Sequence, residues 1–182
     1  MAEVKILFTG YASADSGGRS CSTVTLVRDL DKNIVVDPGT LPEMDILEKA
    51  LKEEGLTPDD IDTVFLTHSH LDHFRGIGLF PKAKVLDYWG WWHSDVCTDY
   101  QDKVTDNIEM IKTPGHSPDG VTFLVKTADG VIAICGDIFW KEGFFADDPF
   151  ATDKELLDVS RKKVLGLADY IIPGHGPMFK AR

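Results

Sequence analysis

The chain has 182 residues, a length that one compact domain accommodates, and we expect a single domain over residues 1–182. Its 19 lysines and arginines against 30 aspartates and glutamates give a formal charge of −11, which disfavours an extended nucleic-acid surface or an anionic membrane as partner. The three cysteines form no C-x-x-C pair and no apolar run reaches the length of a signal peptide or membrane span, so we predict a cytoplasmic protein.

Short apolar runs rich in β-branched and aromatic residues recur along the chain and predict strands. Glycine, proline and polar residues separate these runs and favour turns. In chain order, the predicted strands cover residues 4–8, 23–27, 34–36, 64–66, 121–125, 131–134 and 170–172. No segment recurs at a fixed period, which excludes a repeat architecture.

Three segments carry the start signal of a helix, a threonine followed three residues later by an acidic side chain. The pairs are Thr40 with Glu43, Thr57 with Asp60, and Thr152 with Glu155. In the first helix, the apolar residues 44, 47, 50 and 51 lie on one face, and Gly55 predicts the end. Helices interspersed among strands predict an α/β domain in which two sheets lie between helices.

The segment 10–22 is composed of small and polar residues and predicts a loop. Such a loop has two interpretations of equal weight. It is either a mobile flap beside a binding site or an ordinary connection between two strands.

The segment Leu-Thr-His-Ser-His-Leu-Asp-His places four candidate metal ligands directly after a predicted strand. These are His68, His70, Asp72 and His73. Imidazole nitrogens and carboxylate oxygens are the ligands that zinc accepts in proteins. Alternate side chains in a loop at a strand end can point to two different places, so two metal ions are within reach.

Three further candidates, His116, Asp137 and His175, each follow a glycine just past an apolar run. A glycine without Cβ allows a sharp bend and a close backbone approach, which lets a strand end present a ligand rigidly. Five of the six histidines of the chain fall in these motifs. A purely structural role for all of them is therefore disfavoured.

These motifs, in this order, resemble those of the metallo-β-lactamase superfamily and span residues 37–177. The resemblance implies a four-layered αβ/βα sandwich that holds two divalent metal ions. It assigns His68, His70 and His116 to one ion, Asp72, His73 and His175 to the other, and Asp137 to both. It also implies that Asp37 supports the ligand loop, because a ligating histidine needs its second nitrogen held.

Within the superfamily, the chain is similar to the group called metallo-β-lactamase domain-containing protein 1, in residues 78–81, 136–139, 148–149, 160–165 and 173–179. True β-lactamases carry a cysteine or a serine-type residue where Asp137 stands, which disfavours antibiotic hydrolysis. Flavodiiron relatives place a glutamate where this chain has His70, so zinc is favoured, with iron or manganese as alternatives. Glyoxalase II adds a C-terminal helical region, whereas this chain ends seven residues after His175, which disfavours a glutathione thioester.

Two adjacent cations that share a water lower its pKa and stabilise the oxyanion formed on attack, so the motifs predict a hydrolase. Asp72 is the predicted catalytic residue, because its carboxylate can orient this bridging water. We expect the substrate to be a small-molecule ester, thioester or lactone. Whether the chain forms a homodimer is left open.

Three alternatives also remain open. A two-metal centre cleaves phosphodiesters readily, which would make the chain an endoribonuclease or phosphodiesterase acting on single-stranded RNA. A mononuclear iron persulfide dioxygenase would keep the same motifs and use one site. A binding module without catalysis is disfavoured by the intact ligand set. Metal content and the salt dependence of RNA binding separate these alternatives.

Two aromatic clusters lie outside the ligand motifs. Trp89, Trp91 and Trp92 can form a substrate wall, stack a base, anchor a dimer or pack in the core. The neighbouring His93 is expected at the surface or at a pocket rim. Phe144, Phe145 and Phe150 lie in a segment that either caps the cleft or packs under the last helix.

Overall fold

The computed structural model describes residues 1–13, 18–43, 45–100, 103–143 and 148–181. Within these residues, most strands belong to two sheets. The first sheet has the order β1 (Glu3–Phe8), β4 (Val24–Asp29), β5 (Lys32–Val36), β6 (Thr63–Phe65), β7 (Lys84–Asp87), β8 (Gly90–His93) and β9 (Val96–Thr98). The second has the order β10 (Ile108–Lys112), β11 (Val121–Thr127), β12 (Gly130–Ile134), β13 (Tyr170–Ile172) and β14 (Phe179–Lys180).

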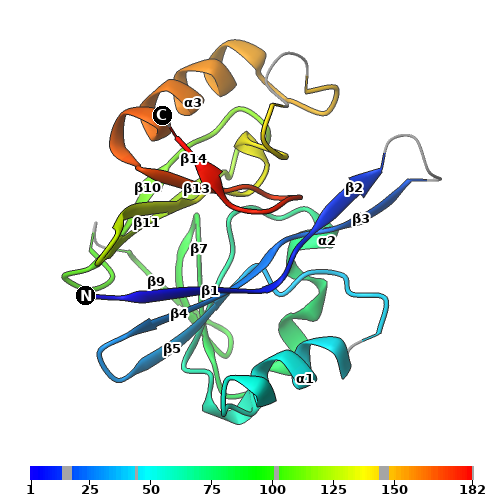
Figure 1. The fold of residues 1–182 in the computed structure, drawn as a ribbon, viewed down its shortest axis with the longest axis vertical. Helices are drawn as coiled ribbons and strands as arrows, with labels where there is room; N and C mark the ends of the chain where they lie inside the picture. Colours follow the sequence, from blue (N-terminus) through cyan, green and yellow to red (C-terminus); the bar gives the residue numbers. More distant parts are fainter. Residues whose placement is uncertain (14–17, 44, 101–102, 144–147, 182) are drawn as a thin grey trace.

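Helices cover the outer faces of both sheets. The α-helices are α1 (Asp45–Glu53), α2 (Leu71–Phe74) and α3 (Lys154–Leu167), and the 3₁₀ helices are η1 (Pro58–Asp60), η2 (Arg75–Leu79) and η3 (Gly136–Ile138). Figure 1 shows α1 outside the first sheet and α3 outside the second, with the two sheets facing each other between them. The predicted four-layered αβ/βα sandwich is therefore confirmed. The longest described helix, α3 with 14 residues, is too short and too polar to span a bilayer.

Three buried cores hold these layers together. Between the sheets, the ring of Phe65 on β6 stacks on Phe123 of β11 with centroids 4.3 Å apart. Leu47 and Leu51 of α1 are fully buried against the first sheet, which confirms the predicted apolar face at these two positions. Ala50 is half-buried, and residue 44 lies outside the described residues. Burial of such a leucine contributes about 1.5–3 kcal/mol. Leu157 and Val164 of α3 pack in the same way on the second sheet.

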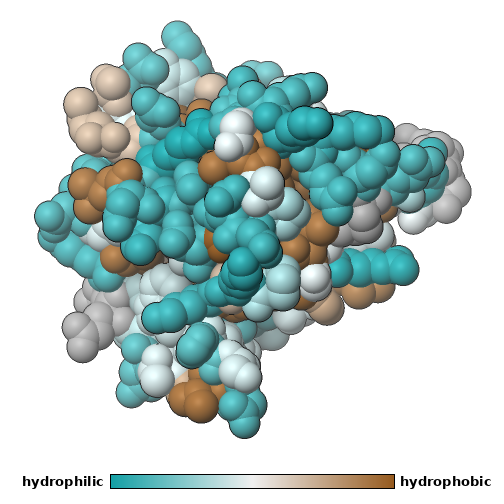
Figure 2. All heavy atoms as spheres, turned by 90° about the horizontal axis from the view of Figure 1, so that it is seen from below, coloured by the Kyte–Doolittle hydropathy of each residue, from teal (hydrophilic) through white to brown (hydrophobic). Residues whose placement is uncertain are grey.

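The outer surface is largely polar. Figure 2 shows one face of the molecule, on which hydrophilic residues predominate and hydrophobic residues are visible in separate patches. This distribution agrees with a chain in which 27% of the residues are charged.

All seven predicted strands are present, with ends shifted by at most two residues. The helix starts differ more from the prediction. Thr40 donates to the carbonyl of Leu71 (2.9 Å) and does not cap α1, which begins at Asp45. Asp153, next to the predicted Thr152, caps α3 by accepting from the backbone N–H of Leu156. The segment after Thr57 forms only the single 3₁₀ turn η1.

The predicted loop 10–22 contains a two-stranded hairpin, so the loop prediction was wrong over its described ends. Strands β2 (Tyr11–Ser13) and β3 (Arg19–Cys21) pair antiparallel, and residues 14–17 lie outside the described part of the chain. The hairpin is tied to the ligand loop, because the backbone N–H of Ser22 donates to the carbonyl of Asp72 (3.1 Å). The small polar residues of this segment do not predict strands, because these strands gain their stability from tertiary contacts and not from the propensity of their residues.

Candidate metal centre

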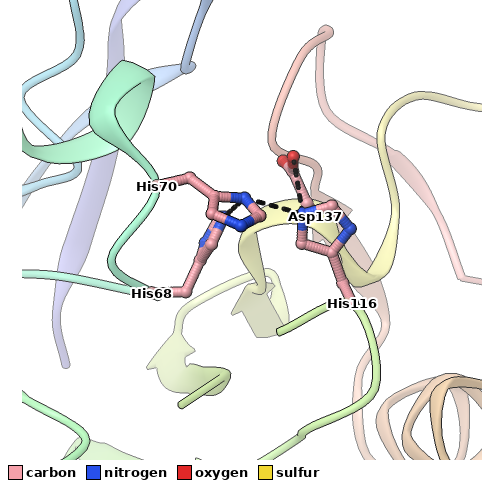
Figure 3. Close-up of side chains that lie close together, drawn as sticks. All are labelled: His68, His70, His116 and Asp137. Carbon is pink, nitrogen blue, oxygen red and sulfur yellow. Dashed lines mark hydrogen bonds and ion pairs between the residues drawn. The ribbon is translucent and has the colours of Figure 1, made fainter. Parts of the chain in front are cut away.

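The first group of candidate ligands is His68, His70, His116 and Asp137. Figure 3 shows the four side chains pointing toward one another, with His68 and His70 on one segment of the chain and His116 and Asp137 on two others. Nδ1 of His70 lies 3.0 Å from Nε2 of His68 and 3.0 Å from Nε2 of His116. The Oδ2 atom of Asp137 lies 3.4 Å from Nε2 of His116.

The second group is Asp72, His73 and His175. Nε2 of His175 lies 3.6 Å from Oδ2 of Asp72. Asp137 of the first group connects it to the second, because its Oδ1 lies 3.1 Å from Nε2 of His73 and its Oδ2 lies 3.1 Å from Nε2 of His175. The structure therefore brings all seven sequence-predicted ligands together, in the two groups and around the shared carboxylate that the sequence motifs implied.

The fold positions these residues at the ends of strands. His68 and His70 follow β6, and the short helix α2 carries Asp72 and His73. The other three ligands follow strands of the second sheet: His116 comes after β10, Asp137 lies in η3 after β12, and His175 comes after β13. Because β5, β6 and β7 are parallel, their carboxyl ends meet at one edge, where ligand sites of α/β folds lie.

Glycines beside the ligands permit this convergence. Gly136 has φ +53°, and a Cβ there would lie 2.3 Å from Oγ1 of Thr67. Gly115 has φ +135°, and a Cβ there would lie 2.3 Å from Cα of Leu157 in α3. A side chain at either position would therefore meet both backbone strain and a steric clash. The predicted close approach of the backbone at these glycines is confirmed.

Asp37 holds the ligand loop from behind, as the resemblance implied. Its carboxylate accepts from the backbone N–H of Thr67 (2.8 Å) and from the Thr67 hydroxyl (2.7 Å). The same carboxylate lies 2.8 Å from Nδ1 of His73, which orients Nε2 of that ring toward Asp137. Asp37 has φ +49°, a conformation that few non-glycine residues adopt, so the surrounding contacts must impose it.

Asp148 orients the His116 ring as Asp37 orients the His73 ring. The sequence analysis did not assign this role to Asp148. Its Oδ2 lies 2.6 Å from Nδ1 of His116, and its side chain is fully buried. Burial raises the pKa of Asp148, but the hydrogen bonds from His116 and from the backbone N–H of Phe150 outweigh it and lower the pKa. Asp148 is therefore ionised and fixes the His116 ring with Nε2 toward the centre.

We expect Asp148→Asn to weaken metal binding by about 10–100-fold, because a ligating histidine loses its charged partner. Competition against a chromogenic chelator measures this affinity. Asp153→Asn is the matched control, since asparagine caps a helix as well as aspartate does and Asp153 lies outside both ligand groups. Equal metal affinity in Asp148→Asn and in the parent protein would show that Asp148 does not support the site.

The electrostatics of the buried centre are dominated by Asp137 and His73. Burial disfavours the charge of both groups, but their mutual attraction outweighs it. The pKa of His73 lies well above its usual value because Asp137 and Asp37 flank it. The pKa of Asp137 lies well below its usual value because His73 and His175 stabilise its charge. For His68, burial and the nearby His73 lower the pKa well below the usual value.

Two buried atoms without a hydrogen bond further indicate that these residues fit a metal ion. Nε2 of His73 and Oδ1 of Asp137 are both buried and form no hydrogen bond, although they lie only 3.1 Å apart. Buried polar atoms rarely stay without hydrogen bonds unless another partner satisfies them. A cation between the two atoms would satisfy both, because it would take the place of the Nε2 proton that the raised pKa of His73 favours in the metal-free centre. Imidazole and carboxylate donors are the set that zinc prefers.

A pocket of about 390 Å³ opens above the two ligand groups. The hairpin contributes Ala12, Gly18, Arg19 and Ser20, the floor is formed by His70, Asp72, His116, Asp137 and His175, and Trp140 and Phe150 complete the lining. The Ser20 hydroxyl donates to the Asp72 carboxylate. This placement favours the interpretation of the segment 10–22 as a flap beside a binding site.

Trp140 and Phe150 form an aromatic wall of this pocket. Their rings stack with centroids 5.7 Å apart and an angle of 4° between the planes. Trp140 also contacts the His116 and His175 rings, at 6.2 and 5.6 Å between centroids. Phe150 therefore borders the cleft, whereas the predicted capping residues Phe144 and Phe145 lie outside the described residues. His93 belongs to neither ligand group, as expected.

Comparison with known proteins identifies relatives across almost the whole chain. Residues 17–90 match the family described as the metallo-beta-lactamase superfamily. The metallo-beta-lactamase domain-containing protein 1 of Xenopus laevis is 33% identical, over 97% of this chain and 81% of the relative. The Homo sapiens protein of that name is also 33% identical, over 81% of this chain and 59% of the relative.

Solved structures show the same fold. A Thermotoga maritima protein of the metallo-beta-lactamase type aligns with a TM-score of 0.76 at 25% identity, over 98% of this chain and 99% of that one. A dizinc quorum-quenching lactonase, solved with its product N-hexanoyl-L-homoserine, aligns with a TM-score of 0.68 at 20% identity, over 86% of this chain and 72% of that one. The ligand geometry, the fold and the sequence relatives agree: the chain belongs to the metallo-β-lactamase superfamily.

Proposed function

We propose that this chain is a hydrolase with a dinuclear zinc centre that cleaves an ester, thioester or lactone bond in a small molecule. Membership of the superfamily supports the hydrolase class. The observation that carries the proposal is the position of Asp137 between the two groups of ligands. Its Oδ2 lies 3.4 Å from Nε2 of His116 in the first group and 3.1 Å from Nε2 of His175 in the second. A carboxylate shared in this way can bridge two cations at a short distance.

In this proposal His68, His70 and His116 hold one ion, Asp72, His73 and His175 hold the other, and Asp137 contacts both. Two metal ions held in this way would supply an activated water and would stabilise the negative charge that develops on the substrate oxygen. Asp72 would orient that water, and the hydrogen bond from the Ser20 hydroxyl holds the Asp72 carboxylate in place. Trp140 and Phe150 pack against the organic part of the substrate and exclude bulk water.

The size and the charge of the pocket favour a small-molecule substrate and disfavour an RNA strand. Its volume of about 390 Å³ lies within the range of ordinary small-molecule sites. Arg19 is the only lysine or arginine among its described lining residues. The Arg19 guanidinium lies over the Tyr11 ring, on the hairpin face opposite Ser20, because successive side chains of a strand alternate. A phosphodiester backbone would therefore find little positive charge from the protein at the cleft.

The fold is compatible with this chemistry, since the neighbour described as a dizinc lactonase has the same architecture. The test is elemental analysis of protein purified without added metal, followed by assays on lactones, thioesters and phosphodiesters. We expect about two zinc ions per chain, and hydrolysis that a chelator abolishes and zinc restores. One iron per chain with thiol-dependent oxygen uptake would instead establish the dioxygenase alternative. Tight binding of single-stranded RNA that weakens steeply with salt would contradict the small-molecule proposal and favour the nuclease alternative.

A further inference from the structure

A second and larger cavity, of about 910 Å³, lies at the opposite end of the first sheet. Residues near the amino ends of the parallel strands β5, β6 and β7 line it, among them Lys32, Thr63 and Lys84. The metal ligands lie past the carboxyl end of β6. The cavity is therefore separated from the candidate metal centre by the length of the sheet, and the proposed hydrolysis makes no use of it.

One side of this cavity is aromatic. Trp91 of β8 lines it, and the Trp91 ring packs edge-on against Phe65 at 6.2 Å between centroids. His93, Val96 and Thr98 lie on the same sheet face as Trp91, because β8 pairs with β9 in the register His93↔Val96 and Trp91↔Thr98. Contact with the core fixes the indole, so it offers a flat surface at a low entropic cost for binding.

The cavity is also locally basic in a chain of net charge −11. It is lined by three lysines and His93, against two aspartates. Both aspartates are already engaged: Asp59 pairs with Lys82 at 2.7 Å, and Asp62 lies 3.8 Å from Lys32. Lys84 has no ion-pair partner among the described residues, so its charge is available to a ligand.

Strand pairing places Lys84 next to His93. β7 and β8 pair in the register Val85↔Trp92 and Leu86↔Trp91, and one further step along both strands sets Lys84 opposite His93. Side chains directly opposite each other on one sheet face are neighbours, so an anion placed between these two can accept hydrogen bonds from both. The Lys84 ammonium and a His93 ring N–H are therefore both hydrogen-bond donors on the sheet face that carries the Trp91 indole.

We propose that this cavity binds a flat aromatic anion, with the ring against Trp91 and the phosphate or carboxylate between Lys84 and His93. Its volume lies in the range of sites that enclose small ligands. The unpaired cation, the aromatic wall and the cavity all lie on one end of the sheet. This site is independent of the proposed hydrolase function, because it shares no residue with the metal ligands.

The test is calorimetric titration of the metal-bound protein with adenosine 5′-monophosphate and with 2-naphthoate, which separate a phosphate from a carboxylate as the anionic group. Adenosine has the aromatic ring without the phosphate, and ribose 5-phosphate has the phosphate without the aromatic ring. We expect each of these to bind at least about tenfold more weakly than the nucleotide, as loss of one good contact predicts. Lys84→Glu should weaken binding of the aromatic anion by a similar factor and leave the metal content unchanged.

Lys162→Glu is the matched control, because it makes the same change of charge at an exposed position on α3. It should leave affinity unchanged. The affinity that is lost in Lys84→Glu relative to the parent protein measures binding in this cavity. Binding that remains in Lys84→Glu is assigned to the metal centre. The proposal is overturned if neither aromatic anion binds, or if Lys84→Glu binds both as tightly as Lys162→Glu does.

Discussion

Asp137→Asn is expected to abolish hydrolysis and to prevent stable binding of both metal ions, with little change of fold. Among the described ligands, Asp137 is the one whose carboxylate lies against both groups, with Oδ2 3.4 Å from Nε2 of His116 in the first group and 3.1 Å from Nε2 of His175 in the second. Asparagine keeps the shape of the side chain but removes the negative charge and one acceptor oxygen. Loss of a supporting residue behind a ligand costs about 10–100-fold in affinity or activity, so loss of the shared ligand should exceed about 100-fold.

Elemental analysis and the rate of lactone or thioester hydrolysis measure this effect, and far-UV circular dichroism reports the fold. Asp129→Asn is the matched control, because it makes the same chemical change at an exposed position in the turn between β11 and β12. The control should retain full metal content and rate. If Asp137→Asn still bound two ions per chain and hydrolysed at a tenth of the parent rate or more, the bridging role would be refuted.

The residues of the metal centre could be predicted because their signals are local. His68, His70, Asp72 and His73 are adjacent in sequence, and each remaining ligand sits beside a glycine at a strand end. The part played by Asp148 could not be found in this way. It lies 32 positions from His116, and an aspartate before a proline has the same local signature whether it faces a histidine or solvent. Tertiary contacts bring the pair together, because the backbone N–H groups of Thr152 and Asp153 donate to the carbonyls of His116 and Gly115.

The elements of the fold also differ in this way: local sequence patterns predict some of them, and tertiary contacts stabilise the others. The seven predicted strands could be found because apolar runs mark strands that are largely buried. Strands β7 and β10 also contribute to the inter-sheet core but were not predicted, because charged residues flank or interrupt their short apolar stretches. Strands β8 and β9 were not predicted either, since Trp91 and Trp92 are half-buried and the residues of β9 are exposed. Their pairing extends an existing sheet edge, so context and not composition stabilises them. The cap of α3 was misplaced by one residue because Thr152 and Asp153 are both good caps.

Gly174→Ala is expected to reduce metal binding although no ligand is changed. A Cβ at this position would lie 1.8 Å from Oδ1 of Asp137 and 3.1 Å from the backbone carbon of Gly136. The backbone of Gly174 cannot retreat easily, because its N–H donates to the carbonyls of Gly136 (3.0 Å) and Phe139 (2.9 Å) and its own carbonyl accepts from Thr23. The shared carboxylate must therefore move, and overpacking of this kind costs about 1–3 kcal/mol of stability.

Urea unfolding and elemental analysis test this prediction, with Gly166→Ala as the matched control. A Cβ at Gly166 would meet nothing within 4 Å, and its position in α3 favours alanine over glycine by about 1 kcal/mol. The same substitution should thus stabilise the chain at residue 166 and destabilise it at residue 174, where it should also lower the metal content. Equal stability and two bound ions in both variants would mean that Asp137 can bind metal from a displaced position. The backbone at Gly174 would then have no part in fixing the site.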